Sequence, residues 1–327
     1  MSGIFLAIVI VMGVTLVGLL VVDIVVTIKR RDNTLTLTRL GRYFNDHLLR
    51  FNAFVLLLLF CVVWVVPLVV GVLGSFTSKW AFEYQPGHLF PSDGFTFDNY
   101  IDLFNQTRVD GTTYPVGNWL LNSFIVATAS TFLYLLVAGA AAYAFVFLNF
   151  RFRDAIFGVM LFTMVIPGIA TLTPQLANIA NLGIARTLWA LILPGLGGVG
   201  GMYLIRQFYL GIPKDLIESA RIDGSSDFRI FRRVVLPLGK SVFLVQGLFC
   251  FMGSWNDLMW PQIILGANDM DKWTLQMGVA YISGSRSANT MGMSLAGAMF
   301  SAIPIMILFV ITQNKIIDGV AASGVKG

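Results

Sequence analysis

Two glycine-rich stretches are the first candidates for chemistry, because loops of this kind hold phosphate groups. "GLGGVG" (195–200) matches the dinucleotide-binding spacing G-x-G-x-x-G, and "GKS" (239–241) matches the end of a phosphate-binding loop. The first pattern requires a preceding strand in a βαβ unit. Here it lies in an apolar run, where small residues such as Gly197 and Gly201 favour close helix packing. The second pattern requires glycine where Val234 stands. Neither stretch predicts a nucleotide site.

Side chains suited to catalysis or metal binding are scarce. The two histidines, His47 and His88, lie in predicted loops, and the two cysteines, Cys61 and Cys250, lie in apolar runs that favour small buried side chains. The sequence contains no H-E-x-x-H, no G-x-S-x-G and no Cys/His cluster. We therefore expect no catalytic residue, no metal site and no cofactor in this chain.

The segment 212–237, "IPKDLIESARIDGSSDFRIFRRVVLP", holds nine charged side chains between two apolar runs. Pro213 is a favoured first helical residue, and the Asp-Gly pair at 223–224 predicts a break. Ser225 or Ser226 can cap a second helix, whose apolar positions at helical spacing are Phe228, Phe231 and Val235. We predict a small helix–turn–helix, which either lies on lipid headgroups or contacts a protein partner.

The elements around this segment are predicted membrane helices. The chain of 327 residues is 57% apolar and only 12% charged, and a membrane-spanning helix needs about 20 apolar residues. Helix is the expected form, because backbone groups in lipid must be paired within the segment. We predict seven spans, at 3–28, 51–76, 119–148, 155–176, 188–210, 238–265 and 290–316. The longer loops between them are 77–118 and 267–289.

The distribution of basic residues predicts how these spans are oriented. With the N-terminus outside and the C-terminus inside, 17 of the 22 lysines and arginines fall on the cytoplasmic side, as the positive-inside rule requires. Within the spans the only acidic residues are Asp23 and Asp257, and each lies near an end. This pattern weakens the case for a proton- or sodium-coupled transporter. We divide the chain into an N-terminal helix with a basic linker (1–50) and a membrane domain (51–327).

The charged segment resembles a motif of a known family. "ESARIDGSSDFRIFRRVVLP" is similar to the E-A-A-x-x-D-G loop in the permease subunits of bacterial ABC importers. The residues that carry the resemblance are Glu218, Ala220, Asp223, Gly224, Phe231 and Pro237. Ser219 stands where the family usually has alanine.

Five further stretches resemble the carbohydrate branch of that family, and the resemblance as a whole covers about 51–327. They are "FTFDNYIDLF" (95–104), "NWLLNSFIVA" (118–127), "MVIPGIATLTP" (164–174), "GSWNDLMWPQIIL" (253–265) and "DGVAASGVKG" (318–327). The last is similar to the tail of the smaller maltose-importer permease.

The resemblance implies an all-α polytopic bundle, with a six-helix core and one extra N-terminal helix. It implies half of a sugar channel in a bacterial inner membrane, completed by a second, related permease. Two ATPase subunits would bind ATP and Mg, and an external solute-binding protein would deliver a di- or oligosaccharide. The coupling residues would be Glu218, Ser219, Ala220, Arg221, Asp223, Gly224, Phe231 and Pro237. A second contact to the ATPases would come from Gly324, Val325, Lys326 and Gly327.

Residues of the substrate path are harder to choose. Hydrogen-bonding and aromatic side chains in the predicted spans supply the candidates Asn122, Gln175, Gln246, Trp255, Asn256 and Trp260. The same residue types also anchor spans at the interface or link neighbouring helices, and the partner permease could carry most sugar contacts. Two alternative functions stay open: an ABC importer permease for another small solute, and an ATP-independent secondary transporter.

Overall fold

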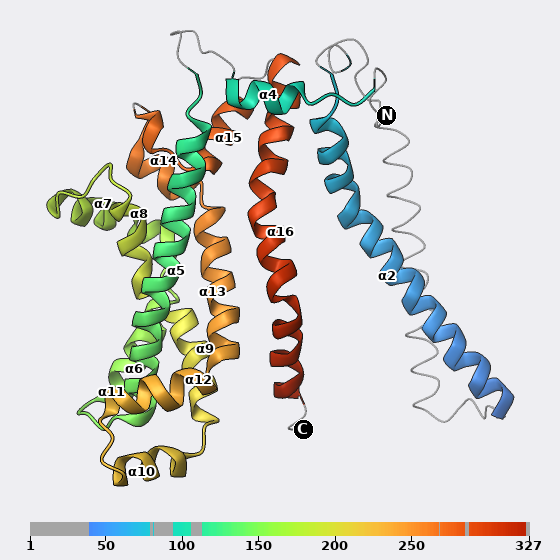
Figure 1. The fold of residues 1–327 in the computed structure, drawn as a ribbon. Coiled ribbons are helices and arrows are strands. Elements are labelled where there is room, and N and C mark those ends of the chain that lie inside the picture. The colour runs from blue at the N-terminus through green and yellow to red at the C-terminus, as the bar shows by residue number, and fades with distance from the viewer. Residues whose placement is uncertain are drawn as a thin grey trace. The chain divides into compact units, whose positions relative to one another are not determined.

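The computed structural model describes residues 39–78, 81, 94–105, 113–267, 269–284 and 288–324. The predicted span at 3–28 lies outside these residues. The chain forms two compact units, Met1–Asn99 and Tyr100–Gly327. All the elements assigned across the described residues are helices (Figure 1), in agreement with the all-α prediction.

In the first unit, one long helix accounts for the predicted span at 51–76. Helix α2 (Arg39–Ser75) contains an uninterrupted apolar stretch, Arg50–Ser75, with a mean hydropathy of 3.1. Its carboxyl end is closed by Asn99, whose amide donates hydrogen bonds to the carbonyl oxygens of Ser75 (3.0 Å) and Thr77 (2.8 Å). Asn99 lies in the short helix α4 (Asp98–Asn105), within the long predicted loop 77–118.

The second unit is a bundle around α5 (Val116–Phe147). This helix packs against α13 (Lys240–Trp255) and α9 (Val199–Leu210), and α13 also contacts α16 (Ala288–Gly324). Helix α5 and the stretch Met291–Gln313 of α16 are each long and apolar enough to cross a membrane. They correspond to the predicted spans at 119–148 and 290–316.

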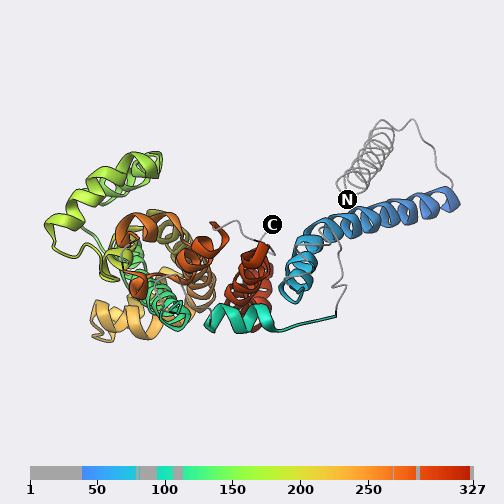
Figure 2. The same cartoon turned by 90° about the horizontal axis from the view of Figure 1, so that it is seen from above.

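Two other predicted spans are broken rather than straight. The span at 155–176 divides into α6 (Arg153–Thr163) and a second part, formed by η1 (Gly168–Thr171) and α7 (Leu172–Asn181), with a bend of 100°. Figure 2 shows α7 projecting from the bundle of α5, α13 and α16. The break lies at Pro167, which lacks an N–H and disfavours helix in the residue before it. The span at 188–210 divides into α8 (Trp189–Ile192) with η2 (Leu193–Gly197), and α9, bent by 46°.

The predicted span at 238–265 is also interrupted. It comprises α13 and, after a short turn, α14 (Met259–Leu265). The short helix α12 (Leu236–Leu238) connects the charged segment to α13. The chain bends by 80° between α12 and α13. Gly239 lies at this corner. Glycine suits the position because a β-carbon there would approach the ring of Tyr209 to 3.2 Å. The "GKS" stretch therefore forms a helix junction instead of a phosphate loop.

The predicted loop at 267–289 contains packed structure. A 3₁₀ turn, η4 (Met270–Lys272), precedes α15 (Leu275–Gly284), which buries Leu275, Met277, Val279 and Ile282. Its neighbour Trp119 is fully buried and stacks on Trp273, with ring centroids 6.1 Å apart. Sequence hydropathy did not indicate a membrane span here because the helix is only 10 residues long.

Of the two glycines predicted to pack closely, Gly201 does and Gly197 does not. A β-carbon on Gly201 would overlap the hydroxyl group of Tyr134 and lie 2.5 Å from Oε1 of Gln246. A β-carbon on Gly197 would meet no atom within 4 Å, so this glycine is not required for close helix packing. The contact is made between α9, α5 and α13.

Candidate functional site

The charged segment begins with α10 (Lys214–Ile222), one residue later than predicted, because Pro213 is its N-cap. Asp215 lies in the first turn and Arg221 in the last, which suits the positive and negative ends of the helix dipole. Ile217 is 2% exposed and holds the helix against the bundle, whereas Ile222 is 86% exposed. Helix α10 therefore presents both apolar and charged side chains outward.

The break after α10 depends on Gly224, whose φ is +76°. The N–H of Gly224 donates to the Arg221 carbonyl and that of Ser225 to the Ala220 carbonyl, both at 3.0 Å. This pair of bonds is the Schellman motif, which satisfies carbonyl groups at a helix end and favours glycine at the left-handed position. The predicted helix break is confirmed.

The second helix starts at Ser226, whose hydroxyl accepts a hydrogen bond from the N–H of Arg229 at 3.4 Å. Helix α11 (Asp227–Ile230) continues into a π-helical turn, η3 (Phe231–Val235), before α12. The extra residue in this turn shifts the buried face onto Ile230 and Val235. The prediction that Phe228 shares that face is wrong, because its side chain is 72% exposed.

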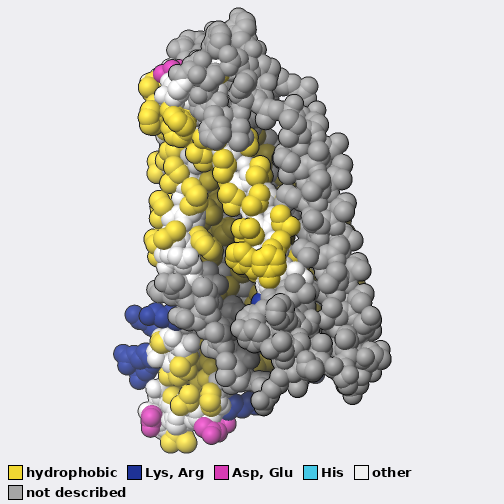
Figure 3. Space-filling view, turned by 90° about the vertical axis from the view of Figure 1, so that its right-hand side faces the viewer, with side chains coloured by type: hydrophobic (Ala, Val, Ile, Leu, Met, Phe, Trp, Pro, Cys, Tyr) yellow, Lys and Arg dark blue, Asp and Glu magenta, His cyan; other side chains and the backbone are white. Residues whose placement is uncertain are grey.

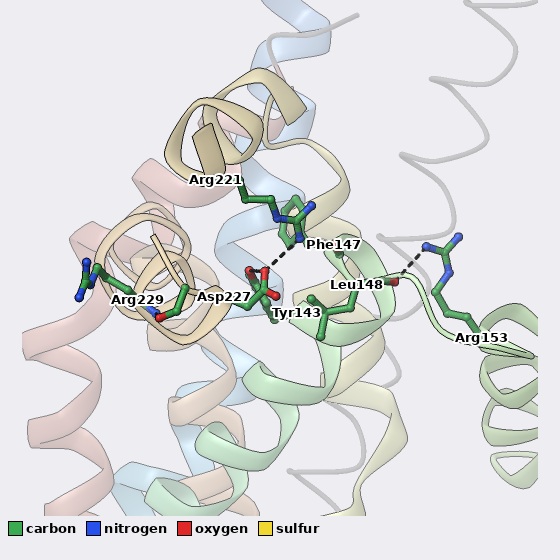
Figure 4. A network of polar contacts seen from close by, with 8 residues as sticks. Tyr143, Phe147, Leu148, Arg153, Arg221, Asp227 and Arg229 are labelled. Atoms are coloured by element: carbon green, nitrogen blue, oxygen red, sulfur yellow. Dashed lines mark hydrogen bonds and ion pairs between the residues drawn. The ribbon is translucent and has the colours of Figure 1, made fainter. Parts of the chain in front are cut away.

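Two hydrogen-bonded side chains tie the turn to the bundle (Figure 4). Nη2 of Arg221 donates to the carbonyl oxygen of Phe147 (2.9 Å) and to Oδ1 of Asp227 (3.0 Å). The hydroxyl group of Tyr143 donates to the same Asp227 oxygen at 3.2 Å. The Phe147 carbonyl belongs to the last turn of α5, where carbonyl groups lack helical partners. The bond to Asp227 raises the pKa of Arg221 above its ordinary value, so the guanidinium stays charged.

We expect Arg221→Gln to loosen this turn without unfolding the bundle. The contact is about half exposed, so solvent limits its contribution to about 1 kcal/mol, which corresponds to about a fivefold change in local opening. Hydrogen exchange of residues 214–226 should rise by about that factor. The matched control is Arg229→Gln, because the Arg229 guanidinium lies away from Arg221 and Asp227 (Figure 4). Equal exchange in both variants would contradict the anchoring role.

The predicted coupling residues lie together on this loop. Glu218, Ser219, Asp223 and Gly224 are exposed around the end of α10, while Ala220 is half-buried. Phe231 is half-buried, and its ring contacts Tyr143 at 5.4 Å. Pro237 is exposed within α12. Of the predicted tail contact, Gly324 ends α16, and Val325, Lys326 and Gly327 lie outside the described residues.

Most charged side chains drawn in colour in Figure 3 gather at the lower end of the face, where α10 lies in Figure 1, below a broad hydrophobic surface. Asp227 and Tyr143 were not chosen as site residues from the sequence. They are 84 positions apart, and no local pattern indicates that the two would meet.

A cavity of about 500 Å³ lies higher in the same unit, between α5, α7, η2, α13 and α14. Two of the six predicted substrate-path residues, Gln175 and Trp260, line it. The amide of Gln175 donates to the Thr171 hydroxyl at 3.2 Å, and Nε1 of Trp260 donates to the Ala190 carbonyl at 3.1 Å. The cavity also includes Asp257.

The other four candidates do not line this cavity. Asn122 donates to the carbonyl oxygens of Asp271 and Trp273, at 2.7 and 3.0 Å, and so holds the turn before α15. Trp255 is 1% exposed and donates to the Ser301 carbonyl at 3.0 Å.

The remaining two candidates lie on α13 and at its end. Gln246 is buried beside Gly201. Asn256 accepts a hydrogen bond from Gln276 at 3.3 Å. The polar groups of Asn122 and Trp255 bond to backbone carbonyls of other segments, which is the alternative that the sequence left open.

Comparisons with known proteins agree with this architecture. Residues 135–316 match the family described as "Binding-protein-dependent transport system inner membrane component". This match includes the whole charged segment and all the cavity-lining residues except Ser130.

Three relatives are named as permeases. The arabinooligosaccharides transport system permease protein AraQ of Bacillus subtilis (strain 168) is 32% identical over 71% of this chain and 79% of its own length. The alpha-glucoside transport system permease protein AglG of Rhizobium meliloti (strain 1021) is 32% identical over 71% of this chain and 61% of its own. The sn-glycerol-3-phosphate transport system permease protein UgpE of Pectobacterium atrosepticum is 29% identical over 79% and 90%.

One solved structure shares the fold. A chain of a bacterial ABC transporter involved in the import of the acidic polysaccharide alginate superposes with a TM-score of 0.70. The match covers 86% of this chain and 99% of that chain, at 23% sequence identity. At this identity the likeness supports the fold alone.

Proposed function

Because the chain belongs to the family of binding-protein-dependent transport system inner membrane components, we propose that it is the permease subunit of an ATP-driven importer for neutral sugars. The observation that carries the sugar assignment is the 32% identity to permeases named for arabinooligosaccharides and alpha-glucosides. The relative named for sn-glycerol-3-phosphate makes a phosphorylated polyol the second candidate cargo.

The charged loop is the proposed contact to the ATPase subunits. Leu216, Ile222 and Phe228 are 46%, 86% and 72% exposed, among the charges of α10 and α11. Apolar side chains in such a setting favour a protein partner, because a helix laid into a groove gains affinity from a few apolar anchors. Glu218 lies on the same short helix and would orient the contact through charge.

The proposed assembly has a second, related permease, two ATPase subunits that bind ATP and Mg, and an external solute-binding protein. In this mechanism, closure of the ATPase pair moves the docked α10, and α5 receives that movement through Arg221 and Phe147. The bundle then alternates between openings to the two sides of the membrane. ATP hydrolysis is assigned to the partner subunits, and the helix junction at Gly239 and Lys240 supports this assignment.

The test is reconstitution of the complete importer in proteoliposomes, with uptake of labelled arabinotriose, maltotriose and sn-glycerol 3-phosphate. We expect ATP-dependent uptake of at least one neutral sugar, and neither ATP binding nor hydrolysis by the purified chain alone. Sugar uptake by this chain alone, without ATPase subunits, would favour the secondary transporter. Uptake restricted to sn-glycerol 3-phosphate would assign the second cargo.

The orientation of the chain is a separate prediction. In the predicted arrangement, 17 of the 22 lysines and arginines fall on the cytoplasmic side of the membrane. A tag after Gly327 should therefore be inaccessible in intact spheroplasts, and a tag before Gly3 should be accessible. Protease protection measures both. An N-terminal tag that is protected from protease would contradict the predicted seven-span arrangement.

A further inference from the structure

The cavity between α5, α7, η2, α13 and α14 contains polar groups that helix packing does not account for. Ser130 is 8% exposed and lines the cavity, and its hydroxyl group has no hydrogen-bond partner among the described residues. Buried hydroxyl groups are normally paired. The oxygen is itself inaccessible to water, so Ser130 forms part of the wall and its hydroxyl group does not reach the open space of the cavity.

Asp257 supplies the charge of the cavity. Its Oδ1 accepts a hydrogen bond from the N–H of Trp260 at 3.4 Å, which leaves part of the carboxylate's capacity of about four bonds. Ser254 lines the same wall one turn away on α13. Among the described residues that line the cavity, Asp257 is the only charged one.

Three glycines keep the cavity open. Gly168, Gly195 and Gly253 all line it, and a β-carbon built on any of them would meet nothing within 4 Å. A side chain at any of these positions would therefore begin in open space without displacing a neighbour. The glycine of "GLGGVG" at 195 thus shapes a cavity instead of packing against a helix.

We propose that this cavity is a sugar-binding subsite contributed by this chain, and that it selects neutral over anionic sugars. Sugar hydroxyls both donate and accept hydrogen bonds, so they match the Asp257 carboxylate, the Ser254 hydroxyl and the Gln175 amide. The Trp260 indole, held by its bond to Ala190, adds an aromatic wall. A volume of about 500 Å³ lies within the range of small-molecule sites, about 300–1,000 Å³.

The charge of Asp257 decides the cargo class. A carboxylate accepts hydrogen bonds from hydroxyl groups but repels an anionic ligand, and the repulsion is strong where solvent is partly excluded. A metal ion is a poorer fit, because the described residues contain no group of three or more metal-ligating side chains. The inference rests on the proposed function and adds to it a site and a charge preference.

Cys250 allows occupancy to be measured directly, because it lines the cavity and is a free thiol. In a Cys61→Ser background it is the only cysteine. The reconstituted importer is treated with methyl methanethiosulfonate, with maltotriose, arabinotriose or trigalacturonate present. We expect at least one neutral trisaccharide to slow labelling of Cys250 at least threefold, and trigalacturonate, which carries three carboxylates, to leave it unchanged. Asp257→Asn should raise the half-protecting sugar concentration about tenfold.

Blocking the cavity is the second measurement. Gly253→Leu should abolish sugar uptake while the complex still assembles, and Gly158→Leu should preserve uptake. Gly158 is the matched control, because it lies within helix α6, also has open space around its β-position and does not line the cavity. Normal uptake by Gly253→Leu, or equal protection by trigalacturonate, would overturn the inference while leaving the proposed function intact. Absence of sugar uptake by the unmodified importer would instead refute the proposed function.

Discussion

Gly224→Pro is expected to abolish coupling between sugar uptake and ATP hydrolysis while the chain still inserts and assembles its bundle. Proline fixes φ near −65°, whereas Gly224 has φ of +76°. Proline also removes the N–H that bonds to the Arg221 carbonyl at 3.0 Å, and it disfavours the near-helical conformation of Asp223. These three conflicts cannot be relieved in place, so the turn must rearrange and carry α10 away from its position.

The measurement is copurification of the ATPase subunits, together with sugar-stimulated ATP hydrolysis in proteoliposomes. A loss of about 1.4 kcal/mol in docking already lowers affinity tenfold, so we expect at least a tenfold loss of copurifying ATPase. Lys214→Pro is the matched control. It places the same residue at the first position of α10, where proline is favoured. If Gly224→Pro couples as well as Lys214→Pro does, the loop is a lipid-facing segment and the proposed coupling site is wrong.

Gly278→Ala is expected to destabilise the bundle although it adds only one carbon. A β-carbon at this position would overlap the indole ring of Trp119. That ring cannot move freely, because it is fully buried, stacks on Trp273, and its Nε1 donates to the Met270 carbonyl at 2.7 Å. Overpacking of this kind costs about 1–3 kcal/mol.

The melting temperature of the detergent-solubilised chain, followed by tryptophan fluorescence, should fall by several degrees in Gly278→Ala. Gly284→Ala is the control, because it lies in the same helix and its β-position is open. It should keep or slightly raise the melting temperature, since alanine favours helix over glycine. A stable Gly278→Ala protein would mean that Trp119 is free to shift and that α15 is loosely packed.

The two predictions differ in how far the sequence alone supports them. The helix break at Gly224 follows from an Asp-Gly pair between two amphipathic stretches, and the structure confirms it through bonds that span only a few residues. The close approach of Gly278 to Trp119 joins positions far apart in the chain. From the sequence, the segment 267–289 is predicted only as a polar loop. Hydropathy and its periodicity do not indicate which distant residue a short helix packs against.

The candidate substrate residues show the same limit. A sequence identifies Asn, Gln and Trp in apolar runs, but it does not distinguish a side chain that binds cargo from one that satisfies a backbone carbonyl. The side chains of Asn122 and Trp255 donate hydrogen bonds to backbone carbonyl groups of distant segments. Gln175 and Trp260 remain at the cavity.

The amino-acid sequence by itself determined the membrane class, the helical architecture and the position of the charged loop with its turn. These properties depend on composition and on neighbours a few residues apart, through burial in lipid and local hydrogen bonding. Only the tertiary structure decided where the spans bend, that Arg221 and Tyr143 hold Asp227 against α5, and which polar groups face the cavity. Those arrangements depend on contacts between residues far apart in the chain, such as Tyr143 and Asp227 at 84 positions, and their geometry is set by how whole helices pack.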